Sequence, residues 1–184
     1  VGRGAFMGDL EGARELASRL IATAGRLGLP AVALLTDMES PLGLTVGNAL
    51  EVAESMDVLK GGGPADVRDL SLEIASRMIL LGGAAESAEA AAVRSRTVLD
   101  DGSALTVFRR FVEAQGGDPA VVDDATLLPR AAVEVVVEAE RDGFVSSADA
   151  LEIGLASVGL GAGRKAVGET VDPGVGIELL RPLG

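Results

Sequence analysis

The 184-residue sequence contains no cysteine, histidine, tryptophan or tyrosine, and its only aromatic side chains are four phenylalanines. The absence of cysteine excludes disulfides, thiolate metal sites and a cysteine nucleophile. The absence of histidine removes the commonest general base, the Ser-His-Asp triad and every histidine-ligated zinc site. With so few aromatic rings, stacking platforms for single-stranded nucleic acid are not expected. The core must therefore be built mainly from Ala, Val, Leu and Gly.

Positive charge is also scarce, with 16 Lys and Arg against 28 Asp and Glu and a net charge of −12. This balance argues against a nucleic-acid partner or an anionic membrane surface, because both need clustered positive charge. No apolar run approaches the roughly 18 residues needed to cross a bilayer. A chain that is 48% hydrophobic and 24% charged is not a disordered acidic tail. We expect a soluble, globular protein, long enough to bury a core.

The first part of the chain predicts half of an α/β unit. Asp9 is a plausible N-cap for a helix whose apolar residues recur at helical spacing as far as Leu27. Gly28 suits the end of that helix. Residues 31–36 form a short apolar run between breakers, which is typical of a buried parallel strand. The loop at 37–43 would then follow the carboxyl end of the strand, where open α/β sheets bind ligands.

Four further helices are predicted, and their short links imply a helical layer beside the sheet. Asn48 is a natural N-cap for the first of them. The apolar spacing predicts the others over about 66–81, about 87–99 and from a cap at Ser103 to a stop near Gln115.

The pattern changes near residue 130, after which the chain looks like a small β-rich module. Val133, Val135 and Val137 alternate with Glu134 and Glu138, as in a strand exposed on one side. A second strand is predicted to begin at 144–145, followed by a helix over about 147–158. A glycine-rich loop and a final strand at 175–180 complete the module.

No short motif assigns an activity by itself. Gly2, Gly4 and Gly8 make a poor dinucleotide fingerprint, because the third glycine is misplaced and no strand precedes them. Glu51 and Glu54 lie three residues apart on a helix, and the pattern alone favours two solvated carboxylates over a general acid–base pair. The residues by themselves predict an α/β protein of unassigned activity.

Seven segments together resemble the thymidine and pyrimidine-nucleoside phosphorylases. They occur in the family's order and are spread along nearly the whole chain: residues 1–7, 33–43, 46–52, 101–104, 114–118, 142–145 and 160–164. The resemblance implies phosphorolysis of a pyrimidine nucleoside by inorganic phosphate to a free base and a pentose 1-phosphate, with no organic cofactor. It also implies a cytoplasmic enzyme that is a homodimer in the full-length protein.

The resemblance implies a specific place for this chain in the family's fold. Residues 1–130 would form the later part of the α/β phosphorylase domain with its helical layer. Residues 131–184 would form a small C-terminal α+β hammerhead-like module without its last strand. The family's phosphate loop and its catalytic His, Arg, Ser and Lys have no counterpart here, so no catalytic residue is assigned and those groups are expected upstream of Val1. Both ends of the chain look cut, and we expect a piece of a longer protein.

The same resemblance assigns two sets of binding residues. Phe6 occupies the position that lines the base pocket in the family, although a core aromatic capping the sheet would also fit the pattern. Leu42, Thr45 and Glu54 match ligands of a potassium ion, which is chemically sensible because a weakly charged hard cation takes several oxygens from loop carbonyls and a carboxylate. The alternative for Glu54 is a solvated surface carboxylate.

Two other classes of protein remain as alternatives. One is a biotinyl- or lipoyl-carrier module, which needs a lysine on a hairpin, usually flanked by methionine. Lys165 lies between Arg164 and Ala166 and lacks that signal. The other is a non-catalytic scaffold that kept the fold and lost the site.

Overall fold

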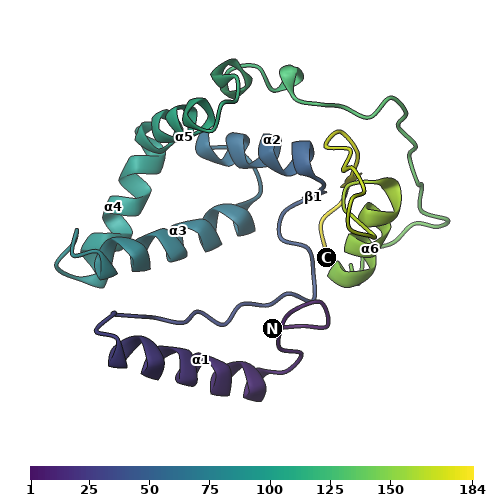
Figure 1. Ribbon diagram of the computed structural model, residues 1–184. Helices are drawn as coiled ribbons and strands as arrows, with labels where there is room; N and C mark the ends of the chain where they lie inside the picture. The colour runs from purple at the N-terminus through teal and green to yellow at the C-terminus, as the bar shows by residue number, and fades with distance from the viewer.

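A computed structural model describes all 184 residues, and most of its ordered structure is helical (Figure 1). In chain order the elements are α1 (Leu10–Arg26), β1 (Thr45–Val46), α2 (Asn48–Leu59), α3 (Ala65–Leu81), α4 (Ala88–Asp100), α5 (Ser103–Ala114), the 3₁₀ turns η1 (Pro119–Val122) and η2 (Ala125–Leu127), α6 (Ala150–Leu160) and β2 (Ile177–Glu178). None of the helices is long and apolar enough to span a membrane.

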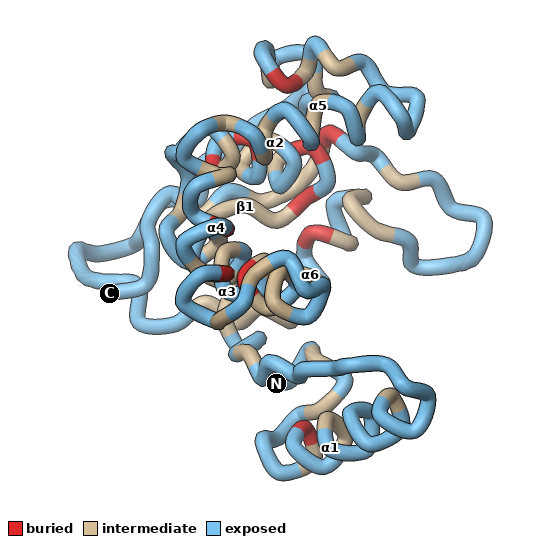
Figure 2. Tube along the Cα trace, turned by 90° about the vertical axis from the view of Figure 1, so that its left-hand side faces the viewer, coloured by how far each residue is buried: buried red, intermediate tan, exposed pale blue.

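Helix α1 forms as the sequence predicts and stands apart from the other helices (Figures 1 and 2). The Asp9 side chain accepts a hydrogen bond of 2.8 Å from the Gly12 amide, which confirms it as the N-cap. Just beyond the helix end, Gly28 has a φ of +72°, the left-handed conformation that glycine adopts without strain. Only the extended segment that follows lies alongside α1.

The strand predicted at 31–36 is wrong, because these residues are extended but belong to no sheet. Their apolar side chains, among them Val32 and Leu35, are exposed. A lone strand cannot satisfy its own backbone groups, and neither strand of the sheet pairs with this segment. At its end, Val1 N donates to the Thr36 carbonyl at 2.6 Å and Met38 N donates to the Val1 carbonyl at 2.8 Å, the bonding pattern of a parallel pair.

Helices α2 to α5 pack on one another, with α3 against α4, α4 against α5, and α2 touching both α3 and α5. The expectation that Asn48 caps α2 is wrong. Gly47 is the cap, and Asn48 is the first helical residue, whose side-chain amide donates to the Ala162 carbonyl at 2.9 Å. Gly47 has a φ of +147°, and a Cβ there would lie 2.6 Å from the Val175 carbonyl oxygen, so close packing of backbone explains the glycine.

The sheet contains two short antiparallel strands, in which Thr45 pairs with Glu178 and Val46 pairs with Ile177. The predicted final strand at 175–180 is thus reduced to Ile177–Glu178. The helical layer does not cover a larger sheet as expected, since the sheet consists of β1 and β2 and β1 packs mainly against α2 and α6. The coarse class is confirmed as mixed α and β.

Residues 129–149 run as an extended arc from η2 to α6 (Figure 1). The strands predicted at 133–137 and 144–145 are therefore wrong, and Val137 is 91% exposed. Alternation of valine and glutamate favours a strand only where a partner strand supplies hydrogen bonds, and none lies beside this segment. The helix predicted from about 147 begins instead at Ala150, because Asp149 caps it by accepting from Glu152 N at 3.1 Å.

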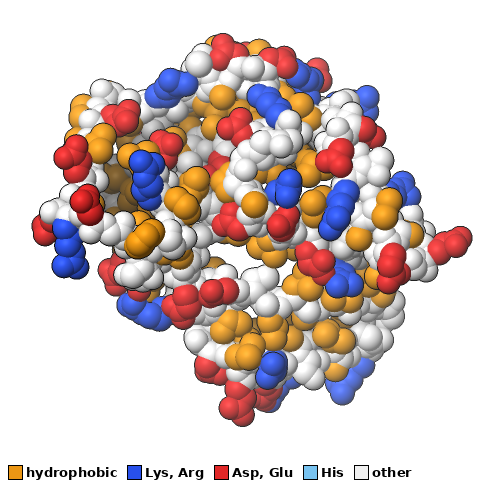
Figure 3. All heavy atoms as spheres, turned by 180° about the vertical axis from the view of Figure 1, so that it is seen from behind, with side chains coloured by type: hydrophobic (Ala, Val, Ile, Leu, Met, Phe, Trp, Pro, Cys, Tyr) orange, Lys and Arg blue, Asp and Glu red, His pale blue; other side chains and the backbone are white.

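The core is small, with only 13 of 184 residues buried, and the expectation of a sizeable core is wrong for this chain. Figure 2 shows the buried residues scattered among α2, α3, α4 and α6 and almost absent from α1. Many hydrophobic side chains lie on the surface instead, including a group over the lower lobe in Figure 3. Apolar faces that have no partner within the chain account for the shortage of core.

Candidate functional site

The loop that precedes β1 is held by three separate elements. The Leu44 amide donates to Glu54 Oε1 of α2 at 2.8 Å, and the Gly43 amide donates to Asp66 Oδ2 of α3 at 2.9 Å. The Leu44 carbonyl accepts from the Leu179 amide, next to β2, at 2.7 Å. The predicted metal ligands Leu42, Thr45 and Glu54 are therefore brought to one place, since the first two flank this anchored stretch.

Gly43 is the tightest point of the loop. It is buried and has a φ of +75°, and a Cβ there would lie 2.2 Å from Glu54 Oε2 and 2.8 Å from Val67 Cγ2. No other residue type fits this conformation and this space together. The glycine lets the Glu54 carboxylate approach the loop backbone directly.

Two oxygen atoms of the loop have no hydrogen-bond donor. The Thr45 hydroxyl oxygen is buried and has no hydrogen-bond partner, although a buried polar atom is nearly always paired. The Leu42 carbonyl accepts no hydrogen bond from the chain. Glu54 forms no ion pair with any Lys or Arg. A hydroxyl, a free carbonyl and an unneutralised carboxylate are the kind of donor set that suits a hard cation.

The charge of this donor set is low. No three acidic side chains in the structure are placed so that they could hold a metal ion together. Glu54 supplies the single negative charge among the three predicted ligands. The residues present thus fit a monovalent cation better than a divalent one, which usually collects more carboxylates.

Phe6 lies in a separate turn at the start of the chain and is 91% exposed. The turn is closed by hydrogen bonds from Gly2 N to the Met7 carbonyl at 3.2 Å and from Ala5 N to the Gly2 carbonyl at 2.9 Å. No part of these 184 residues covers the ring, so Phe6 belongs to no core within this chain. The exposed ring is free to contact a ligand or another part of a longer polypeptide.

Helix α6 anchors the Phe6 turn. The Arg3 guanidinium forms ion pairs with Asp149, the N-cap of α6, and with Glu152 at 3.3 Å. The Ala150 amide also donates to the Glu39 carbonyl at 2.9 Å, so the segment after 31–36 is held by the same helix end. The C-terminal part of the chain thus positions the first residues.

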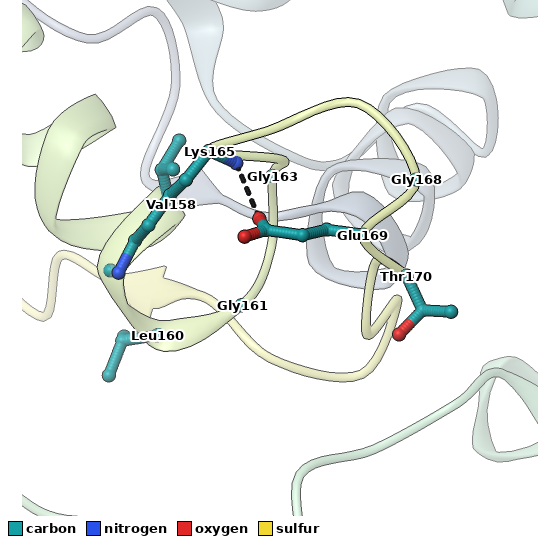
Figure 4. A pocket seen from close by; sticks show the side chains of 9 residues that line it. Val158, Leu160, Gly161, Gly163, Lys165, Gly168, Glu169 and Thr170 are labelled. Atoms are coloured by element: carbon teal, nitrogen blue, oxygen red, sulfur yellow. Dashed lines mark hydrogen bonds between the residues drawn. The ribbon is translucent and has the colours of Figure 1, made fainter.

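A glycine-rich hollow of about 460 Å³ follows α6 (Figure 4). Its wall includes Lys165 and Glu169, and the Lys165 backbone amide donates to Glu169 Oε2 at 2.8 Å. Both residues are exposed and lie in a loop without strands. Lys165 is therefore not displayed on a hairpin, which gives no support to a carrier module.

The groups with perturbed pKa values lie elsewhere, around α4, α5 and the turns after them. A hydrogen bond from Arg109 lowers the pKa of Asp123, and the same bond raises the pKa of Arg109. Hydrogen bonds from Ser103 lower the pKa of Asp101. Each perturbation arises from a turn contact or an ion pair on the surface, so these groups stabilise the fold and mark no catalytic centre.

Two contacts at the loop before β1 and at the Phe6 turn could not be predicted from the sequence. Asp66 has no sequence signal beyond that of an acidic residue in the first turn of a helix, and its bond to Gly43 spans 23 positions. The pairing of Arg3 with Asp149 spans 146 positions and has no local signature either. Both contacts depend on where α3 and α6 pack against distant loops, which only the folded structure shows.

Comparison with known proteins agrees with the resemblance found in the sequence. Residues 144–184 match the pyrimidine nucleoside phosphorylase C-terminal domain. Over 183 residues the chain is 44% identical to the pyrimidine-nucleoside phosphorylase of Geobacillus stearothermophilus and 42% identical to that of Bacillus subtilis (strain 168). A relative of the same name from Staphylococcus haemolyticus (strain JCSC1435) is also 42% identical.

These alignments cover 100% of this chain and 42% of the length of each relative. The similarity therefore extends far beyond the 144–184 match and takes in the Phe6 turn, the loop at 41–45 and the helices around it. The chain is thus similar over its whole length to part of the pyrimidine-nucleoside phosphorylases, and its residues 144–184 match the C-terminal domain of that family.

Proposed function

We propose that the full-length protein phosphorolyses pyrimidine nucleosides, thymidine among them. The observation that carries this proposal is the 44% identity, over the whole chain, to a protein named pyrimidine-nucleoside phosphorylase. In the reaction a phosphate oxygen forms a bond to C1′ of the sugar while the bond from C1′ to the base nitrogen breaks. The electron pair leaves with the base, and the products are the free base and a (deoxy)ribose 1-phosphate.

Residues 1–184 alone are proposed to be inactive. The transition state places negative charge on the departing base and on the attacking phosphate, and both need positioned hydrogen-bond donors or cations. The chain has no histidine, and its two lysines, Lys60 and Lys165, are both exposed. We assign no catalytic residue within it.

The role proposed for Phe6 is contact with the pyrimidine base. Its ring is exposed on a turn that Arg3 and α6 hold in place, so it is available to form one wall of a base pocket. An aromatic face suits the flat, apolar side of a pyrimidine.

The proposed cation is potassium, held by Leu42, Thr45 and Glu54. The unpaired Thr45 hydroxyl, the free Leu42 carbonyl and the Glu54 carboxylate support this assignment. The ion would supply positive charge that fixes an irregular loop. Its role would be structural, since this chain offers no reacting group beside it.

The remaining features of the full-length protein follow the same proposal. It would be a cytoplasmic homodimer that binds a nucleoside and inorganic phosphate without an organic cofactor. Residues 1–130 would complete an α/β domain, in which segment 31–36 gains strand partners. Residues 131–184 would form the hammerhead-like module.

The test compares two purified proteins, residues 1–184 and the full-length polypeptide, each incubated with thymidine and phosphate. Release of thymine by the full-length protein alone is expected, and omission of phosphate should abolish it. Thymine release by residues 1–184 well above the blank would contradict the assignment of catalysis to the rest of the protein. Replacing thymidine by uridine in the same assay decides between thymidine-only and broad pyrimidine specificity.

A further inference from the structure

Asp66 makes a contact that the family resemblance does not assign to any function. Its Oδ2 atom accepts the Gly43 amide at 2.9 Å, across from the first turn of α3 to the loop before β1. The helix has Pro64 at its N-cap position and no side-chain cap. The other oxygen of Asp66, Oδ1, accepts the Val67 amide of the same helix turn at 2.9 Å, so the carboxylate joins its own helix end to the loop. Asp66 forms no ion pair with any Lys or Arg.

The bonded amide belongs to the same peptide unit as the Leu42 carbonyl. The peptide is planar, and the chain contains no cis bond, so the N–H and C=O of this unit point in opposite directions. Fixing the Gly43 N–H on Asp66 therefore fixes the direction of the Leu42 C=O. That carbonyl is one of the three proposed potassium ligands, and it accepts no hydrogen bond of its own.

We propose that Asp66 is a positioning residue for the cation loop, which sets the Leu42 carbonyl for potassium by holding the Gly43 amide. The inference rests on the proposed potassium site. Glu54 holds the next amide, that of Leu44, at 2.8 Å, so two carboxylates from two helices fix consecutive peptide units. Residues that orient a metal ligand from outside typically change metal affinity by about 10–100-fold when they are replaced.

The experiment uses the full-length protein and measures thermal unfolding over a potassium chloride series, with choline chloride holding the ionic strength constant. The readout is the potassium concentration that gives half of the maximal stabilisation. Asp66→Ala should raise this concentration about tenfold or more. Asp66→Asn has one accepting oxygen for the two amides, those of Gly43 and Val67, that the carboxylate holds, so it should raise this concentration less than Asp66→Ala does.

Two further variants separate positioning from charge and from general destabilisation. Asp66→Glu keeps the charge but displaces the oxygen atoms, so it should also raise the half-maximal potassium concentration. It replaces Asp66→Ala in the comparison if that variant does not fold. Asp69→Ala removes a carboxylate of the same helix that is 69% exposed and paired with Arg68, and it should respond like the wild type. A purely structural role would lower the melting temperature equally at every potassium concentration.

An unchanged half-maximal concentration in Asp66→Ala or Asp66→Glu would overturn the inference. A shift in Asp66→Asn larger than that in Asp66→Ala would contradict the role of the accepted hydrogen bond and would overturn the inference too. If the wild type shows no potassium response, both the cation site and this inference fail. Thymine release measured on the same preparations reports separately on the proposed reaction.

Discussion

Replacement of Gly43 by alanine tests how tightly the cation loop is built. The residue has a φ of +75°, a conformation that costs an L-residue about 1–2 kcal/mol. The new Cβ would also lie 2.2 Å from Glu54 Oε2, so that carboxylate must move away. Its hydrogen bond to the Leu44 amide is then lost, and bonds to charged groups contribute about 1.5–3 kcal/mol. The two effects together predict a loss of about 2.5–5 kcal/mol.

The measurement is urea unfolding of the full-length protein, with the change in midpoint converted to free energy through the slope. Gly28→Ala is a matched control, because Gly28 has a φ of +72° but nothing within 4 Å of a Cβ. It should lose only the backbone contribution of about 1–2 kcal/mol. If Gly43→Ala is no more destabilising than Gly28→Ala, the Glu54 carboxylate does not pack on the loop as described.

Three further outcomes are expected in the full-length protein. Phe6→Ala should raise the KM for thymidine roughly three- to tenfold with the fold intact, as judged by circular dichroism, and an unchanged KM would remove Phe6 from the base pocket. Glu54→Gln should keep the Leu44 hydrogen bond but lose the charge, so the rise in melting temperature with potassium should shrink; a wild-type potassium curve would exclude the site. Because Arg109 lowers the pKa of Asp123 below its ordinary 3.8, the Asp123 carboxylate stabilises the fold fully above that pH, and this contribution disappears as the pH falls through the lower, folded-state pKa. Asp123→Asn should therefore lower the urea midpoint of unfolding at neutral pH, and this midpoint should fall less steeply below about pH 4 than that of the wild type. If the midpoints of the two proteins fall equally steeply with acid, the Arg109–Asp123 pair does not contribute as described.

The features that the sequence predicts well are those that a few neighbouring residues determine. Asp9 is predicted to cap α1, and its side chain accepts the hydrogen bond from the amide three residues ahead in the structure. Strands depend on partners, so the apolar run at 31–36 has the right composition and still forms no sheet within this chain. A local pattern cannot say whether a partner strand is present.

The candidate site likewise contains one part that could be predicted from the sequence and one part that depends on tertiary packing. Family resemblance places Leu42, Thr45 and Glu54 together, and the structure does bring Glu54 onto the loop that carries the other two. The contribution of Asp66 could not be predicted, because it depends on how α3 approaches Gly43 and not on any spacing in the sequence. The position of α3 relative to the loop is determined by how the helices pack.

The Arg3 contact with α6 has a consequence for the order of folding. It joins positions 146 residues apart, so the turn that carries Phe6 cannot adopt its anchored position until α6 has been synthesised and has folded. Contacts of such long sequence separation form slowly, because the chain between them must first be ordered. The Phe6 turn should accordingly be among the last elements to settle and among the first to open, with fast amide exchange whenever α6 frays.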